Sequence, residues 1–121
     1  MKRRETGILG ENLAQGHLER LGYHILERNY RCPEGEIDII AKDKDYLVFV
    51  EVRARRSLKF GHPEESITPA KAKRLKACAL YYLQAHSGLS RPWRIDVVVV
   101  ELGYRGAVSR ISLIENAVGE D

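Results

Sequence analysis

Residues 35–55 read GEIDIIAKDKDYLVFVEVRAR, and this stretch decides the fold. Acidic and apolar residues alternate over 36–41, which is the period of two that a β-strand shows. Residues 46–54 are rich in β-branched and aromatic side chains and predict a second strand. The polar segment 42–45 is short enough for a hairpin loop of four residues. We therefore expect a β-hairpin.

The predicted hairpin carries acids beside apolar residues. Alternation places Glu36 and Asp38 on one face of the first strand, and Ile37 and Ile39 on the other. On the second strand, Glu51 lies at the end of an apolar stripe, so we expect this carboxylate to be buried. A buried charge costs several kcal/mol unless a partner compensates it, and two adjacent acids also repel each other. A divalent cation such as Mg²⁺ removes both costs and retains waters for hydrolysis.

Composition limits the classes of protein to consider. The 121 residues are 44% hydrophobic, which predicts a single domain over 1–121. The apolar runs are too short to cross a bilayer, and no secretory signal follows the basic N-terminus, so we expect a cytoplasmic protein without a membrane partner. The two cysteines and four histidines lack the spacing of zinc ligands.

Positive charge is concentrated in one segment, although the net charge is only +3. Residues 53–76 hold eight basic residues and two acids, and this density favours phosphate binding and hence a nucleic-acid partner. An ordinary solvated helix face explains each lysine equally well when it is taken alone. The basic residues expected at the nucleic acid are Arg55, Arg56, Lys59, Lys71 and Arg74.

Further elements flank the hairpin. Apolar spacing predicts a helix over 7–21 and a helix that begins at Thr68-Pro69 and ends near residue 86. Short strands are expected over 23–30, 94–101 and 108–114, with a loop over 57–67.

Four acids remain open to two interpretations each. Asp38 either binds a metal or is a carboxylate satisfied by turn amides or by a neighbouring arginine. Glu11 lies along the edge of the apolar stripe of its helix, where it either reaches a site or is an exposed acid near the helix start. Asp96 either supports the metal ligands or forms a structural ion pair with Arg94, and we expect Glu36 to support them too. Glu51 itself could be an ion-pair partner of Arg53 or Arg55.

Motifs along nearly the whole chain resemble the YraN-like bacterial family of predicted endonucleases. That family is similar to archaeal Holliday-junction resolvases and other nucleases of the PD-(D/E)xK type. The motifs are Gly10-Glu11, Gly22-Tyr23, Asn29-Tyr30-Arg31, Gly35-Glu36-Ile37-Asp38, Val48-Phe49-Val50-Glu51-Val52, Arg55, Lys71, Arg94-Ile95-Asp96-Val97 and Asn116-Ala117.

The resemblance implies an α/β fold with a restriction-endonuclease-like three-layer core, in which helices flank a central mixed sheet in the order α-β-β-β-α-β-β. It also implies that Asp38, Glu51 and the backbone carbonyl of Val52 bind Mg²⁺ or Mn²⁺, with Glu11 completing or supporting the site. The expected substrate is DNA, with branched or flapped DNA as a candidate, and a homodimer is plausible by analogy.

Arg53 departs from the family pattern, which has lysine at this position of the Glu-x-Lys triplet. A guanidinium stays protonated, so Arg53 acts as a fixed donor and positive charge that can clamp a phosphate. We therefore expect a nuclease of reduced or altered activity, in which Arg53→Lys raises the rate. The alternatives are a nucleic-acid-binding module without catalysis, in which Arg53 replaces the metal as counter-ion of Glu51, and a structural protein whose hairpin acids only form ion pairs.

Overall fold

The computed structural model describes residues 3–55, 67–86, 91–103, 105 and 107–118. These residues form two helices and five strands. The elements are α1 (Arg3–Arg20), β1 (His24–Cys32), β2 (Gly35–Asp43), β3 (Tyr46–Arg55), α2 (Pro69–His86), β4 (Trp93–Leu102) and β5 (Val108–Ile114).

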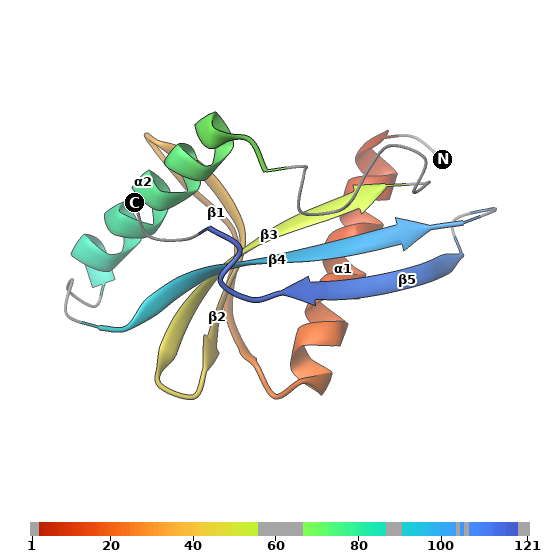
Figure 1. The fold of residues 1–121 in the computed structure, drawn as a ribbon, viewed down its shortest axis with the longest axis horizontal. Coiled ribbons are helices and arrows are strands. Elements are labelled where there is room, and N and C mark those ends of the chain that lie inside the picture. The colour runs from red at the N-terminus through yellow and green to blue at the C-terminus, as the bar shows by residue number, and fades with distance from the viewer. Residues whose placement is uncertain (1–2, 56–66, 87–90, 104, 106, 119–121) are drawn as a thin grey trace.

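The five strands form one sheet in the order β1-β2-β3-β4-β5. β3 and β4 are parallel, and α2 connects them, whereas the other neighbouring strands are antiparallel. Figure 1 shows α1 behind the strands and α2 at their left end. The mixed sheet with its two helices confirms the predicted α/β fold and the element order of a restriction-endonuclease-like core.

Each face of the sheet has its own hydrophobic core, and β4 contributes to both. Leu18 of α1 packs in a cluster with Val50 and Val98, while Leu75 of α2 packs in a second cluster with Phe49 and Ile95. This two-sided burial explains why β4 reads as an almost unbroken run of β-branched residues.

The turn of the hairpin is shorter than predicted. Asp43 pairs with Tyr46, so only Lys44 and Asp45 form the turn and the expected loop of four residues is wrong. Lys44 has a φ of 56°, which is the left-handed conformation that a two-residue hairpin turn requires. The strands are therefore longer than the polar residues at their ends suggested.

The start of α2 is as predicted. The hydroxyl of Thr68 accepts a hydrogen bond from the Lys71 N–H at 3.1 Å, which is the geometry of a helix N-cap, and Pro69 follows as the first helical residue. Most of the loop expected over 57–67 lies outside the described residues. In the part of the chain that is described, no helix is long and apolar enough to span a membrane.

Gly10 lets α1 approach β3 closely. A Cβ atom built on Gly10 would lie 2.5 Å from the Cβ of Ala54, a distance that real contacts do not show. The absence of a side chain at this position therefore sets the depth at which α1 lies on the sheet. Glu11 is the next residue on this helix, so the same contact fixes its position.

We expect Gly10→Ala to lower the free energy of unfolding by about 1 to 3 kcal/mol, because the added methyl group overpacks the contact between helix and sheet. Urea denaturation measures this change. Gly7→Ala is the matched control, since a Cβ there meets nothing within 4 Å and alanine is the better helix former. Ala54→Gly should restore stability when it is combined with Gly10→Ala. Equal stability of Gly10→Ala and Gly7→Ala would contradict this packing.

Candidate functional site

At Asp38, the apolar side chains of β2 change from one face of the sheet to the other. Ile39 packs in the core under α1, whereas Ile37 packs in the core under α2. The prediction that these two residues share a face is therefore wrong. Between their partners on β1 lies Asn29, whose φ of 54° is left-handed, a conformation that asparagine tolerates. Because β2 is irregular at this point, the surroundings of Asp38 differ from those that regular alternation predicts.

The pairing of β2 with β3 ends just before Asp38. The last pair of the ladder joins Ile39 to Val50, and the same register continued by one residue would set Asp38 opposite Glu51. Instead of a main-chain acceptor, the Asp38 carboxylate accepts the hydrogen bond of the Val52 N–H at 2.8 Å. The carboxylate thus occupies the gap where the two strands separate, next to Glu51.

The surroundings of Asp38 raise the pKa of its carboxyl group. Burial is the largest cause that raises the pKa of Asp38, to about 7, and the charge of Glu51, a hydrogen bond with Glu51 and the charge of Glu11 raise it further, against the opposing effect of the Val52 N–H. Glu51 is buried, with 4% of its surface exposed. Without a metal, the carboxyl group of Asp38 therefore keeps its proton to a higher pH than an ordinary aspartic acid does.

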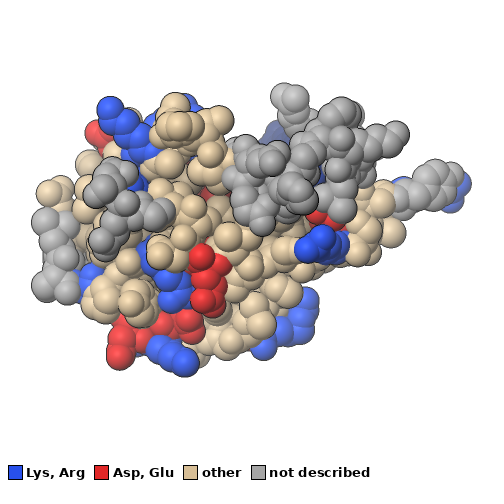
Figure 2. Space-filling view, viewed as in Figure 1, with Lys and Arg blue, Asp and Glu red and all other residues tan. Residues whose placement is uncertain are grey.

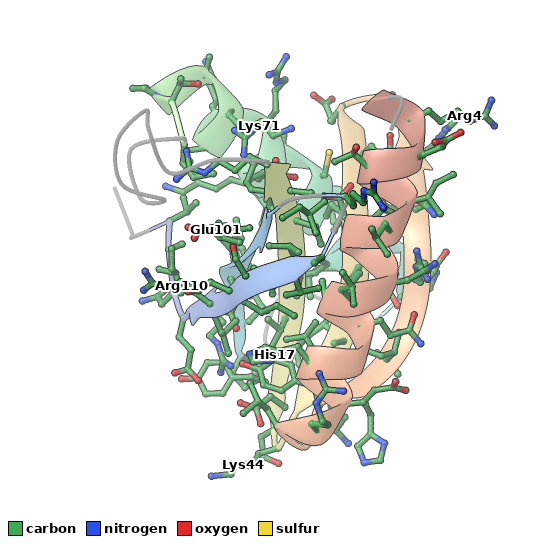
Figure 3. All side chains as sticks on the ribbon, turned by 90° about the vertical axis from the view of Figure 1, so that its right-hand side faces the viewer. Arg4, His17, Lys44, Lys71, Glu101 and Arg110 are labelled. Atoms are coloured by element: carbon green, nitrogen blue, oxygen red, sulfur yellow. The ribbon has the colours of Figure 1, made fainter. Side chains whose placement is uncertain are left out.

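Two cations approach Glu51. The Nζ atom of Lys71 lies 3.2 Å from Glu51 Oε2, and the Nε atom of Arg53 lies 3.5 Å from the same oxygen. Arg53 comes from β3 itself, whereas Lys71 comes from the first turn of α2. In Figure 3, Lys71 lies at the end of the molecule opposite the hairpin turn marked by Lys44.

Glu11 is held beside the site by Arg28, a residue that the sequence analysis missed. The Arg28 guanidinium lies 3.3 Å from Glu11 Oε1 and donates further hydrogen bonds to Asn12 at 2.8 Å and Gln15 at 3.2 Å. Glu11 therefore faces β1 and β2 and is close enough to raise the pKa of Asp38. A basic residue inside a predicted strand was the only signal for Arg28.

Asp96 belongs to a separate network. It is fully buried and bonded by Arg94 Nε at 3.0 Å, the Tyr23 hydroxyl at 2.9 Å and the Asn116 N–H at 2.9 Å. Its register partner on β3 is Val50, which packs on the α1 face, whereas Glu51 meets α2. Of the two interpretations left open, the geometry supports the structural ion pair.

Glu36 lies at the surface on β2. Its ion-pair partner is Arg31, at 3.9 Å, and its side chain is 42% exposed. This cross-strand pair is weak, and it does not bring Glu36 to Asp38 and Glu51.

The comparison with protein families agrees with these motifs. The model of the uncharacterised protein family UPF0102 matches residues 10–100. The chain belongs to the UPF0102 family. This membership confirms the resemblance to the YraN-like proteins, while the family description names no activity.

Relatives of similar length carry the same family name. A UPF0102 protein of Dehalococcoides mccartyi is 49% identical over 119 residues, which cover 98% of this chain and 97% of its own. One of Caldicellulosiruptor saccharolyticus is 48% identical over 117 residues, covering 97% and 99%. One of Renibacterium salmoninarum is 53% identical over 96 residues, covering 79% and 81%.

The basic residues of this UPF0102 protein do not all gather at the acids. Arg74 is exposed on α2, and Arg55 is half-buried at the end of β3, beside Glu101 of β4. Arg56 and Lys59 lie outside the described residues. On the face shown in Figure 2, blue Lys and Arg atoms are scattered among tan and red ones. Lys71 and Arg53 are the predicted basic residues that the structure brings to Glu51.

The donor atoms of the UPF0102 site suit a hard cation. Within the described ranges, no three or more His, Cys, Asp or Glu side chains are grouped so that they could hold a metal ion. The candidate ligands are therefore the carboxylates of Asp38 and Glu51 and a main-chain oxygen of β3. An all-oxygen set with few protein ligands fits Mg²⁺ or Mn²⁺, which keep several waters, and does not fit structural zinc.

We expect Asp38→Asn to stabilise the metal-free protein more as the pH rises. Because the pKa of Asp38 is raised from 3.8 to about 7, the folded protein binds more protons than the unfolded chain between these values. Stability from this carboxyl group is present at low pH and is lost as the pH rises through about 7. Thermal unfolding in a chelator, at about pH 5 and about pH 8, measures the effect.

The melting temperature of Asp38→Asn relative to the parent protein should rise by at least about 3 °C between these two conditions. Asp45→Asn is the control, because Asp45 is exposed in the hairpin turn. A difference that stays constant with pH would contradict the raised pKa of Asp38.

Proposed function

We propose that this UPF0102 protein is a Mg²⁺- or Mn²⁺-dependent nuclease that hydrolyses phosphodiester bonds in DNA. The observation that carries the proposal is the meeting of a half-buried carboxyl group, Asp38, with a buried one, Glu51, where β2 separates from β3. This arrangement does not add to the stability of the fold, because each buried charge costs several kcal/mol. Perturbed acids of this kind are frequent at catalytic sites.

Asp38 and Glu51 would hold the metal, with the carbonyl of Val52 as a third oxygen. The Val52 N–H fixes one oxygen of Asp38, so the carboxylate keeps its orientation when its proton is lost. When bound, the metal would supply hydroxide by lowering the pKa of a water and would balance charge on the scissile phosphate. Arg28 keeps Glu11 beside these acids, where its charge favours a cation.

Arg53 would bind the scissile phosphate. Its guanidinium is permanently charged, and its planar donors match two phosphate oxygens. In the reaction, the water oxygen forms a bond to phosphorus while the bond to the leaving sugar oxygen breaks. The leaving oxygen keeps that electron pair and gains a proton, which balances the proton that the water loses. Arg53 would stabilise the negative charge that accumulates on the phosphate oxygens in the transition state.

A nucleic-acid-binding module without catalysis is the second candidate. It is favoured by one observation: Lys71 and Arg53 already provide Glu51 with two positive partners, so the chain can compensate this charge without a metal. Such a module would bind DNA with a steep dependence on salt and would leave it intact.

A cleavage assay with labelled duplex, flapped and four-way branched DNA decides between the candidates. We expect cleavage in Mg²⁺ or Mn²⁺, none in a chelator, and a loss of at least about 100-fold in Asp38→Asn and in Glu51→Gln. Asp45→Asn should cleave at the rate of the parent protein. This control shows that the loss of an aspartate elsewhere does not lower the rate.

Two results would count against the nuclease. Salt-sensitive DNA binding without cleavage on any of these substrates would favour the binding module. Cleavage that persists in both Asp38→Asn and Glu51→Gln would place the activity elsewhere.

A further inference from the structure

Two cations share one oxygen of Glu51, although one is enough to neutralise it. Lys71 Nζ is at 3.2 Å and Arg53 Nε at 3.5 Å from Oε2. The second cation is therefore more than the ion pair needs, and Lys71 is the one brought from a different element.

The start of α2 fixes the backbone of Lys71. Its backbone N–H is bonded to the N-cap hydroxyl of Thr68, and the Thr68 carbonyl accepts the N–H of Ala72 at 2.9 Å. Leu75, one turn further along α2, is packed in the core of the α2 face. The side chain of Lys71 is 30% exposed, so it reaches Glu51 from the solvent-accessible rim of the site.

The chemistry of the two groups differs. A guanidinium presents a planar fork that suits two phosphate oxygens, whereas an ammonium is compact and directs three donors around one point. Three donors allow one group to contact Glu51 and, at the same time, a water and a phosphate oxygen beside it. Arg53 therefore suits the phosphate, and Lys71 suits the attacking water.

We propose that Lys71 is a catalytic residue whose ammonium group, held at Glu51, orients the attacking water and thereby supplies from α2 the donor that Arg53 does not supply from β3. The assignment rests on the proposed nuclease function. It changes one expectation from the sequence, because a site that already has its lysine gains no rate from Arg53→Lys. That variant should instead bind DNA about fivefold more weakly, since it loses the planar fork.

The test compares Lys71→Met, Lys71→Arg, Arg53→Lys and the double variant Arg53→Lys/Lys71→Met. Each is assayed for cleavage rate at saturating DNA and for DNA affinity in a chelator, so that one measurement needs neither metal nor turnover. Lys73→Met is the control, because Lys73 is exposed two residues further along the same helix.

We expect Lys71→Met to lower the rate about 100-fold or more while DNA affinity in the chelator changes less than about threefold. Lys71→Arg should keep the ion pair, and hence the melting temperature, yet remain slow, because its planar group cannot place its donors around one water. The double variant should regain at least about tenfold of the lost rate, since an amine at position 53 can reach Glu51 from β3.

Three results would overturn the assignment while leaving the nuclease in place. They are a rate of Lys71→Met close to that of the parent protein, a loss of affinity without a loss of rate, and a rate of Arg53→Lys that rises about tenfold above the parent. If neither the parent protein nor Arg53→Lys cleaves DNA with Mg²⁺ or Mn²⁺, the proposed function fails and the assignment fails with it. Folding is checked in Lys71→Arg, which keeps a positive partner for Glu51.

Discussion

The contact of the half-buried Asp38 with the buried Glu51 is the constraint on which the other features of the site depend. Two carboxylates removed from water cannot both remain charged without compensation. In the metal-free protein the compensation comes from the raised pKa of Asp38, from the Val52 N–H and from two cations at Glu51. A divalent cation between the acids would replace the proton on Asp38. The contact therefore suits metal binding, although it costs folding free energy in the metal-free protein.

Both helical layers of the fold meet this contact. Gly10 allows α1 to lie close to β3, which brings Glu11 near Asp38, and the N-cap at Thr68 fixes the turn of α2 that carries Lys71. The sheet contributes the acids because the β2–β3 ladder stops at Ile39 and Val50. Groups from both faces of the sheet thus converge where two central strands separate, which a single strand pair could not achieve.

The sequence predicted the elements well, because their patterns are local. The β-branched and aromatic composition of β3, the apolar run of β4 and the Thr68-Pro69 start of α2 each depend on neighbouring residues. The change of face between Ile37 and Ile39 could not be predicted, since it accompanies a left-handed residue, Asn29, on another strand. The contacts of Arg28 with Glu11, and of Lys71 with Glu51, join residues 17 and 20 positions apart whose proximity only the tertiary structure defines.

A Mn²⁺ titration of isotope-labelled protein, followed by NMR, tests most directly whether the two acids form a metal site. Paramagnetic broadening locates even weak binding and requires no knowledge of the substrate. We expect broadening confined to the residues around Asp38, Glu51 and Val52, and its loss in Asp38→Asn. No localised broadening at millimolar Mn²⁺, or broadening that Asp38→Asn leaves unchanged, would contradict a metal site between β2 and β3.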